Sequence, residues 1–147
     1  MLQSNWLEAN PWLLAAATLS VLGAILHVAC IIGGPDWYRA MGAGEVIARA
    51  AARGSPVPAL MTSGIAVVLL LWAAYALSAA GLLPRLPLRT LALLAIIAVL
   101  TARGLAVLVP DWWRPDLSFN FKLGSSLFVL AMALCFAIGT WQRWDRL

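Results

Sequence analysis

Two ionisable side chains interrupt long apolar stretches of the sequence, and their chemistry makes them the first candidates for a functional site. His27 lies eight residues before Pro35, and Arg103 lies seven residues before Pro110. Ionisable groups inside a membrane-spanning helix are rare and costly, so each one is a hypothesis for a functional site. The ordinary alternatives are a single helix–helix hydrogen bond for His27 and snorkelling to the interface for Arg103. Arg103 could hold an anion, whereas His27 could move a proton near neutral pH.

The two prolines belong to a repeated motif, in which Pro-Asp-Trp-Tyr-Arg at 35–39 recurs as Pro-Asp-Trp-Trp-Arg at 110–114. Proline ends a helix, Asp can cap a new turn, aromatic rings favour the lipid headgroup level, and Arg can reach phosphates. Two interpretations stay open: an interface anchor that arose twice, or a parallel duplication of a two-helix unit. In both interpretations the motif supplies candidate ligand-binding residues at the rim of a site: Asp36, Trp37, Tyr38, Trp112 and Trp113.

Hydroxyl groups accompany the two ionisable residues. At about 1.5 Å per residue, His27 and Arg103 lie roughly 10–12 Å below the same membrane face. Ser63 and Ser125 fall a few residues inside two other apolar stretches and near that face. We expect a polar pocket there, closed at the opposite end by aliphatic side chains. The ordinary alternative is that the hydroxyls bond to their own or a neighbouring helix.

The segment from about residue 44 to residue 53 predicts a short amphipathic helix. Glu45 and Arg49 are four residues apart, which favours an ion pair on one helix face. The helix could lie flat on the membrane interface or fold back over the polar layer. Glu45 or Asp36 could neutralise Arg103, and a buried Glu45 could act as an acid or a base.

The composition indicates which elements position these residues. The chain has 147 residues, of which 63% are hydrophobic and 11% charged, against about 25% charged in soluble domains. Apolar stretches of a length that crosses about 30 Å of hydrocarbon as helices occur at about 12–32, 57–80, 90–109 and 123–141. They do not alternate as barrel strands do. We predict an all-α integral membrane protein, with residues 1–147 forming one bundle of four transmembrane helices.

Charge and cysteine content limit the partners. Lysine and arginine are divided almost evenly between the two faces, but the short second loop carries Arg85 and Arg89 without an acid, which favours cytoplasmic termini. The net charge of +4 fits a protein beside anionic lipid, and no basic stripe on a soluble element indicates nucleic-acid binding. Cys30 and Cys135 lack metal-ligand spacing, so we expect neither a metal nor a cofactor.

Three stretches carry a family resemblance: HVACIIGGPDWYRAMGAGE, PALMTSGIAVVLLLWAAYALSAAGLLPRLPLR and TARGLAVLVP. Over about the first three spans they resemble a group of small, uncharacterised four-span inner-membrane proteins of bacteria. This resemblance implies a bacterial inner-membrane location and no activity. The four-helix layout with a polar end is also similar to the sterol-isomerase-like (EXPERA) membrane fold, which works with His, Glu and Trp in an intramembrane pocket. That second likeness is one of fold and residue types.

Four functions remain open at this stage. The favoured one is the binding of an amphipathic or anionic small molecule or lipid, with Arg103 on the anion and apolar side chains on the tail. The second is a small membrane enzyme that uses His27 or Glu45 as acid or base. The third is a transporter protomer, for which four helices would have to assemble as a homo-oligomer. The fourth is an accessory subunit without a ligand.

Overall fold

The computed structural model describes residues 9–109 and 117–147, and this part of the chain contains helices and no strands. The long helices are α2 (Pro11–Ala40), α4 (Val57–Ala80), α5 (Arg89–Leu105) and α6 (Phe119–Gln142). The shorter elements are α3 (Glu45–Ala52) and two 3-10 turns, η1 (Ala106–Leu108) and η2 (Trp144–Arg146). With η1 extending α5, all four long helices are long and apolar enough to cross a membrane. The chain is therefore an all-α, multi-pass membrane protein, as predicted.

Local signals explain most helix ends. The side chain of Asn10 caps α2, because its Oδ1 accepts a hydrogen bond from the Leu13 N–H at 3.0 Å. Ser118 caps α6 in the same way, with its Oγ accepting from the Phe121 N–H at 3.3 Å. Gly81 ends α4 in the left-handed conformation, at φ 89°, which a glycine adopts without strain.

A kink in α2 lies close to the predicted end of the first span. The sequence predicts that this span stops near residue 32, ahead of Pro35, and the regular helix breaks at Gly34, although α2 as a whole continues to Ala40. Gly34, at φ 70° and ψ −150°, breaks the helical geometry, and a second helical segment then begins at Pro35. Proline is well suited to the first turn of a helical segment, where its missing N–H is not needed. The proline thus restarts the helix after a kink.

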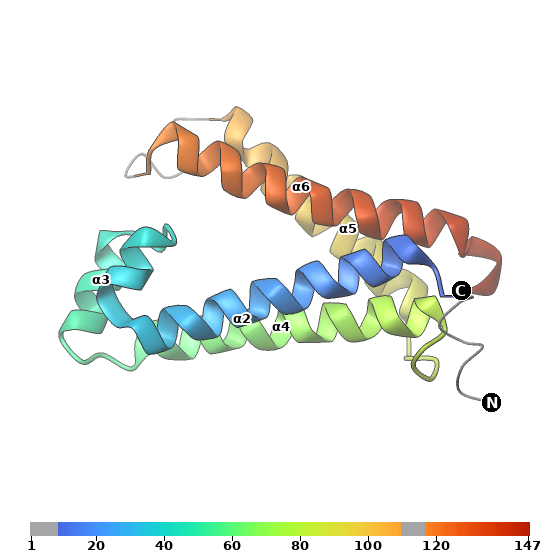
Figure 1. Ribbon diagram of the computed structural model, residues 1–147, viewed down its shortest axis with the longest axis horizontal. Helices are drawn as coiled ribbons and strands as arrows, with labels where there is room; N and C mark the ends of the chain where they lie inside the picture. Colours follow the sequence, from blue (N-terminus) through green and yellow to red (C-terminus); the bar gives the residue numbers. More distant parts are fainter. Residues whose placement is uncertain (1–8, 110–116) are drawn as a thin grey trace.

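The four long helices pack as two pairs, α2 with α4 and α5 with α6 (Figure 1). The pairs are joined where α2 packs on α6, and α4 and α5 meet over a shorter stretch. Each pair consists of two spans that are consecutive in the sequence. The halves differ locally, because α2 runs past its proline, whereas α5 ends at Leu105 and turns through η1 before residue 110. The second copy of the motif lies outside the described residues.

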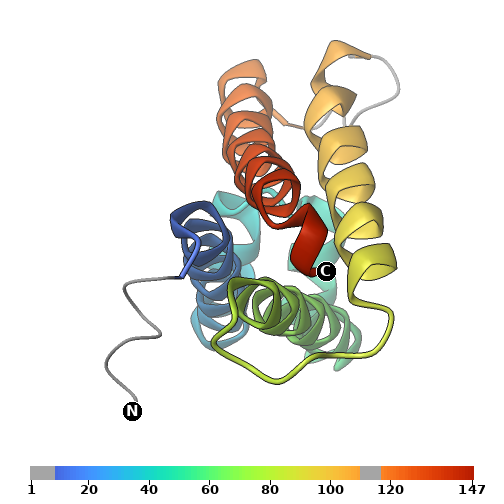
Figure 2. The ribbon, with the colours of Figure 1, turned by 90° about the vertical axis from the view of Figure 1, so that its right-hand side faces the viewer.

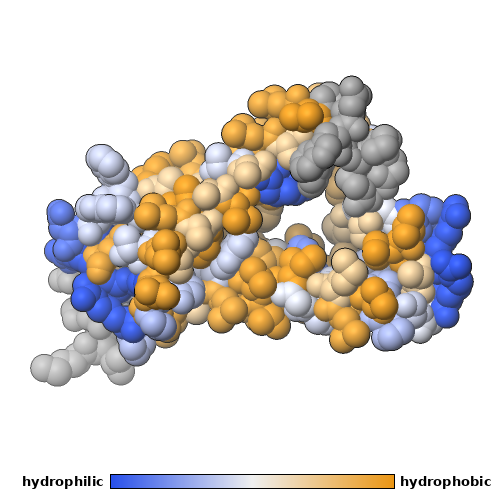
Figure 3. Space-filling view, turned by 180° about the vertical axis from the view of Figure 1, so that it is seen from behind, coloured by the Kyte–Doolittle hydropathy of each residue, from blue (hydrophilic) through white to orange (hydrophobic). Residues whose placement is uncertain are grey.

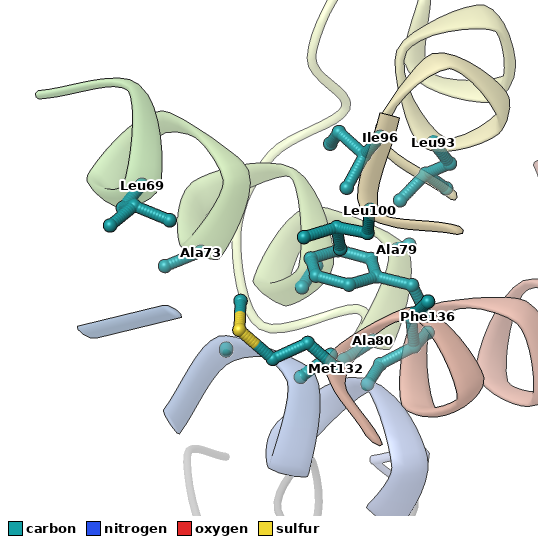
Figure 4. Packing of buried hydrophobic residues seen from close by; sticks show 14 of the residues in the cluster. Leu69, Ala73, Ala79, Ala80, Leu93, Ile96, Leu100, Met132 and Phe136 are labelled. Atoms are coloured by element: carbon teal, nitrogen blue, oxygen red, sulfur yellow. The ribbon is translucent and has the colours of Figure 1, made fainter. Parts of the chain in front are cut away.

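The main hydrophobic core occupies the half of the bundle near Asn10 and Leu147. Figure 4 shows part of it, with side chains from several helices packed together. Small residues dominate it, and Phe136 and Leu13 are fully buried within it. A Cβ on Gly139 of α6 would lie only 2.6 Å from the Leu13 Cγ of α2. Small residues of this kind let helices approach closely in a membrane. The two pairs therefore meet at this end of the molecule.

A smaller core lies at the opposite end, where α3 folds over the kinked end of α2. Cys30 and Tyr38 of α2 are buried there against Ala48 of α3. Ile47 and Ala51 of α3 pack against the same cluster, which gives the short helix one protein-facing side. The predicted amphipathic helix is thus present, and it rests on protein.

Candidate functional site

The two helix pairs separate beyond the main core. The residues of the main core that lie nearest to α3 are Ala24 in α2, Ala66 in α4, Leu100 in α5 and Met132 in α6. Figure 3 shows the resulting gap between the pairs, with mostly hydrophobic walls and a strongly hydrophilic residue at its rim. The gap lies on the side where the sequence predicts a polar pocket.

Arg103 lies in the last turn of α5 on this side and is half-buried. Its Nη2 donates to the Ser125 Oγ of α6 at 3.5 Å, and that hydroxyl donates to the main-chain oxygen of Lys122 at 3.1 Å. Lys122 itself is only 8% exposed in the first turn of α6. The Arg103 guanidinium and the Ser125 hydroxyl, from neighbouring helices, are donors of the kind that suits a carboxylate or a phosphate, and Lys122 adds a second positive charge one turn before Ser125.

An apolar groove of about 340 Å³ lies between α4 and α5. Its lining residues are Val68, Leu71, Trp72 and Tyr75 of α4, and Ala92, Ala95, Ile96 and Val99 of α5. Ala92, Ile96, Val99 and Arg103 recur at intervals of three and four residues, so they share one face of α5. Arg103 follows Val99 by about 6 Å along the axis. Arg103 therefore lies on the groove-lining face of α5, about one turn beyond the last residue that lines the groove.

A second hollow, of about 350 Å³, extends the groove along α4. It is lined by Met61, Gly64, Ile65, Val68, Leu69 and Trp72, so it shares Val68 and Trp72 with the first. Gly64 has no neighbouring atom within 4 Å of where a Cβ would be, which leaves this stretch of the helix uncovered. From Met61 to Tyr75 the apolar surface spans about 21 Å, roughly two thirds of the hydrocarbon thickness of a bilayer.

His27 faces inward but makes a local bond. It continues the buried stripe of Ser20, Gly23 and Ala24 by one turn toward the gap. Its Nδ1 lies 2.7 Å from the main-chain oxygen of Gly23, on its own helix. Such a bond satisfies a polar ring in an apolar span, and the acid–base role of His27 stays a prediction.

The acidic residues of the first loop bind arginines of that loop. Glu45 accepts hydrogen bonds from the Arg39 Nε at 2.9 Å and the Arg49 Nε at 3.0 Å. Asp36 accepts from the Arg39 Nη1 at 2.8 Å. The structure thus corrects the expectation that Glu45 or Asp36 neutralises Arg103, because nearer arginines hold both carboxylates at the exposed surface.

The same contacts bear on acid–base chemistry. Hydrogen bonds from Arg39 and Arg49 lower the pKa of Glu45 to about 2. A catalytic acid or base works best when its pKa lies near the operating pH. In this arrangement Glu45 acts as a permanent anion that ties the kinked end of α2 to α3.

The aromatic residues of the first motif separate. Trp37 is 43% exposed, and its indole lies where a side chain on Gly33 would otherwise be. Tyr38 is only 3% exposed, because it packs under α3. The prediction that Tyr38 lines the rim of the polar pocket is therefore wrong. Trp112 and Trp113, the corresponding residues of the second motif, lie outside the described residues.

The hydroxyl layer is only partly assembled. Ser125 joins Arg103, whereas Ser63 is exposed on the side of α4 that faces away from the groove. Lys122 was not among the predicted site residues, although it precedes Ser125 by three positions and so shares its helix face. The spacing of Lys122 within the first turn of α6 is the signal that could have found it.

The first loop also approaches the gap. Gly42, at φ 74°, lies against the ring of Phe121 in α6, which fills the space where a side chain on Gly42 would be. Phe121 directly precedes Lys122. The loop between α2 and α3 therefore bridges the two helix pairs beside the cationic residues.

Among residues 9–109 and 117–147, no cluster of His, Cys, Asp and Glu could hold a metal ion. No protein-family model, no curated protein and no solved structure matches the chain. Function is therefore argued from the chain's own residues.

Proposed function

We propose that this protein binds an amphipathic anion, a lipid or a lipid-like molecule, with its charged group at Arg103 and its apolar chain in the α4–α5 groove. One observation carries the proposal: the face of α5 that lines the groove through Ile96 and Val99 ends in Arg103. Ligand sites are mostly apolar with a few convergent polar groups, and this surface has that composition.

The charged end favours an anion over a neutral group. Arg103 and Lys122 both lie in partly or largely buried positions, where the effective dielectric is lower than in water. Coulomb attraction rises as the dielectric falls, so an anion is bound more strongly here than at an exposed arginine. Ser125 adds a hydroxyl that can donate to, or accept from, the same group.

The apolar end favours a long, slender chain. Val68 and Leu71 of the groove are 42% and 53% exposed, and Met61 and Ile65 farther along α4 are 56% and 46% exposed. These residues form a continuous strip that an acyl or isoprenoid chain can cover. Trp72 lies at the junction of the two hollows and offers a broad ring surface to such a chain.

The membrane location is part of the same proposal. We place the protein in the bacterial inner membrane with its termini in the cytoplasm. The family resemblance supports the membrane, and the acid-free second loop with Arg85 and Arg89 supports the orientation. The end of the groove nearest Arg103 then faces the opposite leaflet.

Quenching of Trp72 by brominated lipids tests the proposal. The difference in fluorescence between the natural protein and Trp72→Phe reports the groove, and the probes are brominated phosphatidylglycerol and brominated phosphatidylcholine in neutral detergent. We expect phosphatidylglycerol to quench Trp72 at the lower concentration. Arg103→Gln should raise its half-quenching concentration by about 10- to 150-fold, because a hydrogen bond to a charged group contributes about 1.5–3 kcal/mol.

Arg53→Gln is the matched control, since Arg53 is exposed at the end of α3 and the change removes the same charge. It should leave the quenching curve unchanged. Equal quenching by the two lipids, or an Arg103→Gln protein that keeps its preference for phosphatidylglycerol, would reject Arg103 as the anion contact.

A further inference from the structure

A second cationic cluster lies at the other end of the molecule, where the second loop meets the C-terminal segment. The Nη2 atoms of Arg85 and Arg89 donate to the main-chain oxygen of Arg146, at 2.8 Å and 2.6 Å. Arg85 Nη2 also donates to the main-chain oxygen of Leu147 at 3.1 Å. Two guanidinium groups thus converge on a pair of adjacent oxygens. Figure 2 shows the C-terminus between the ends of α4 and α5.

Arg89 is held firmly in place. It is 9% exposed, and its Nη1 donates to the main-chain oxygen of Ser78 at 2.9 Å, near the end of α4. The Ser78 Oγ fixes the intervening loop, because it donates to the Pro84 oxygen at 2.7 Å and accepts from the Leu86 N–H at 3.2 Å. The Nε of Arg89 has no hydrogen-bond partner within the described ranges. The side chain of Arg89 is therefore preorganised, and its Nε–H is a hydrogen-bond donor that is not used among the described residues.

The charges of this cluster are suited to an anion. In the described part of the chain, the ion pairs belong to Arg39 and Arg49, near α3. Arg85 and Arg89 instead share oxygens of the main chain and lie close enough to repel each other. A phosphate matches the planar fork of a guanidinium and carries the charge that offsets this repulsion.

The C-terminal segment, residues 144–147, which accepts the hydrogen bonds from Arg85 and Arg89, has few packing contacts with the bundle. None of the residues of η2 is buried, and Trp144 is 53% exposed. Only Leu147 packs partly against the main core from this segment. The hydrogen bonds from Arg85 and Arg89 are therefore its principal attachment, and a competing anion can replace them.

The surroundings indicate where such an anion would come from. Trp141 is 81% exposed and Leu88 is 74% exposed, and both lie at this end of the bundle. Exposed tryptophan at the end of a membrane span is typical of the headgroup level of a bilayer. The phosphate nearest to the two arginines is then that of a phospholipid.

We infer that Arg85 and Arg89 form a phosphate site for a phospholipid headgroup, and that residues 144–147 occupy this site when no lipid is bound. The site is separate from the one at Arg103, which lies at the opposite end of α5. The C-terminal segment and the lipid compete for the same guanidinium groups, so removing the segment exposes the site.

A chain that stops after Arg143 tests this competition directly. Soluble dihexanoyl phosphatidylglycerol is titrated into the natural and shortened proteins in neutral detergent, with dihexanoyl phosphatidylcholine and inorganic phosphate as parallel probes. We expect the shortened chain to bind phosphatidylglycerol about tenfold more tightly, and Arg85→Gln in that chain to reverse the gain. Arg53→Gln, the same charge change at the other end, should have no effect.

Each of the following results would overturn a stated part of the proposed phosphate site. Equal affinity of the natural and shortened chains, or no effect of Arg85→Gln in the shortened chain, overturns the site. Binding of inorganic phosphate as tight as that of phosphatidylglycerol keeps the anion site and overturns the lipid as its source. Both lipids carry a phosphodiester, but only phosphatidylglycerol is a net anion. Binding of phosphatidylcholine as tight as that of phosphatidylglycerol therefore contradicts recognition of net negative charge by the two arginines.

The natural protein supplies a second measurement that does not depend on truncation. Hydrogen exchange at the amides of Arg146 and Leu147, which bond to the oxygens of Arg143 and Trp144, reports release of the segment. Phosphatidylglycerol should accelerate this exchange, and phosphatidylcholine should not. Exchange that is unchanged by phosphatidylglycerol contradicts the displacement.

Discussion

The close approach of α2 and α6 at Gly139 determines the shape of the bundle, because it joins the two helix pairs at one end and so leaves the gap at the other. A Cβ at this position would lie 2.6 Å from the Leu13 Cγ and 3.0 Å from the Leu13 main-chain nitrogen. A side chain can rotate away from such a contact, but a backbone atom cannot. Gly139→Ala therefore forces the two helices apart.

The expected magnitude combines two opposing terms. Overpacking of this kind costs about 1–3 kcal/mol, whereas alanine in a helix interior is favoured over glycine by about 1 kcal/mol. Gly124 lies in the same helix and has no atom within 4 Å of where its Cβ would be, so Gly124→Ala gains the second term alone. The difference in unfolding free energy between the two variants isolates the packing cost, about 1–3 kcal/mol.

Reversible unfolding by sodium dodecyl sulfate in mixed micelles, followed by circular dichroism, measures both variants against the natural protein. We expect Gly124→Ala to be slightly more stable than the natural protein and Gly139→Ala to be less stable than Gly124→Ala. If the two alanine variants unfold at the same detergent fraction, the close contact at Gly139, and with it the account of the bundle shape, is refuted.

Three further changes test other parts of the structure. Phe136→Ala removes a fully buried ring and should lower the unfolding free energy by about 3–5 kcal/mol in the same assay. Val99→Phe should fill the groove and weaken brominated-lipid quenching of Trp72, and an unaltered quenching curve would exclude this groove as the chain site. Glu45 should stabilise α3 fully above pH 4.5 and lose this effect as the pH falls to about 2, since its folded pKa is depressed. Hydrogen exchange of α3 in the natural protein and in Glu45→Gln should therefore differ at neutral pH and converge near pH 2, and a constant difference would contradict the role of its charge.

The two proposed anion sites lie at opposite ends of the molecule and differ in exposure. Arg103 is half-buried beside Ser125 and Lys122 is largely buried, whereas Arg85 and Arg89 contact a short segment at the end of the bundle. Changes at one site should leave the other unaffected, because the distance along α5 from Arg89 to Arg103 is about 21 Å. Lipid titrations on Arg103→Gln and Arg85→Gln, measured on the same preparation, separate the two contributions.

The sequence by itself determined that the protein lies in membrane lipid, that its fold is all-α and where its membrane spans lie. A run of about twenty apolar residues has to satisfy its backbone within a helix in lipid, so composition and length are enough. The observed bounds of α4 match the predicted 57–80, and α6 exceeds the predicted 123–141 by a few residues at its capped start. Local spacing also predicted the pairing of Glu45 with Arg49, which the structure contains.

Only the tertiary structure decided which polar residues meet. Glu45 and Asp36 bind Arg39, and Tyr38 is buried, because the kink at Gly34 and the position of α3 set those directions. Ser63 is exposed because the packing of α4 turns its opposite face toward the groove. A span is equally hydrophobic on every side, so its sequence does not reveal which face will meet another helix. The facing of Arg103 toward Ser125, and of Arg85 and Arg89 toward the C-terminal segment, follows from close packing at small residues, which depends on the shapes of all four helices together.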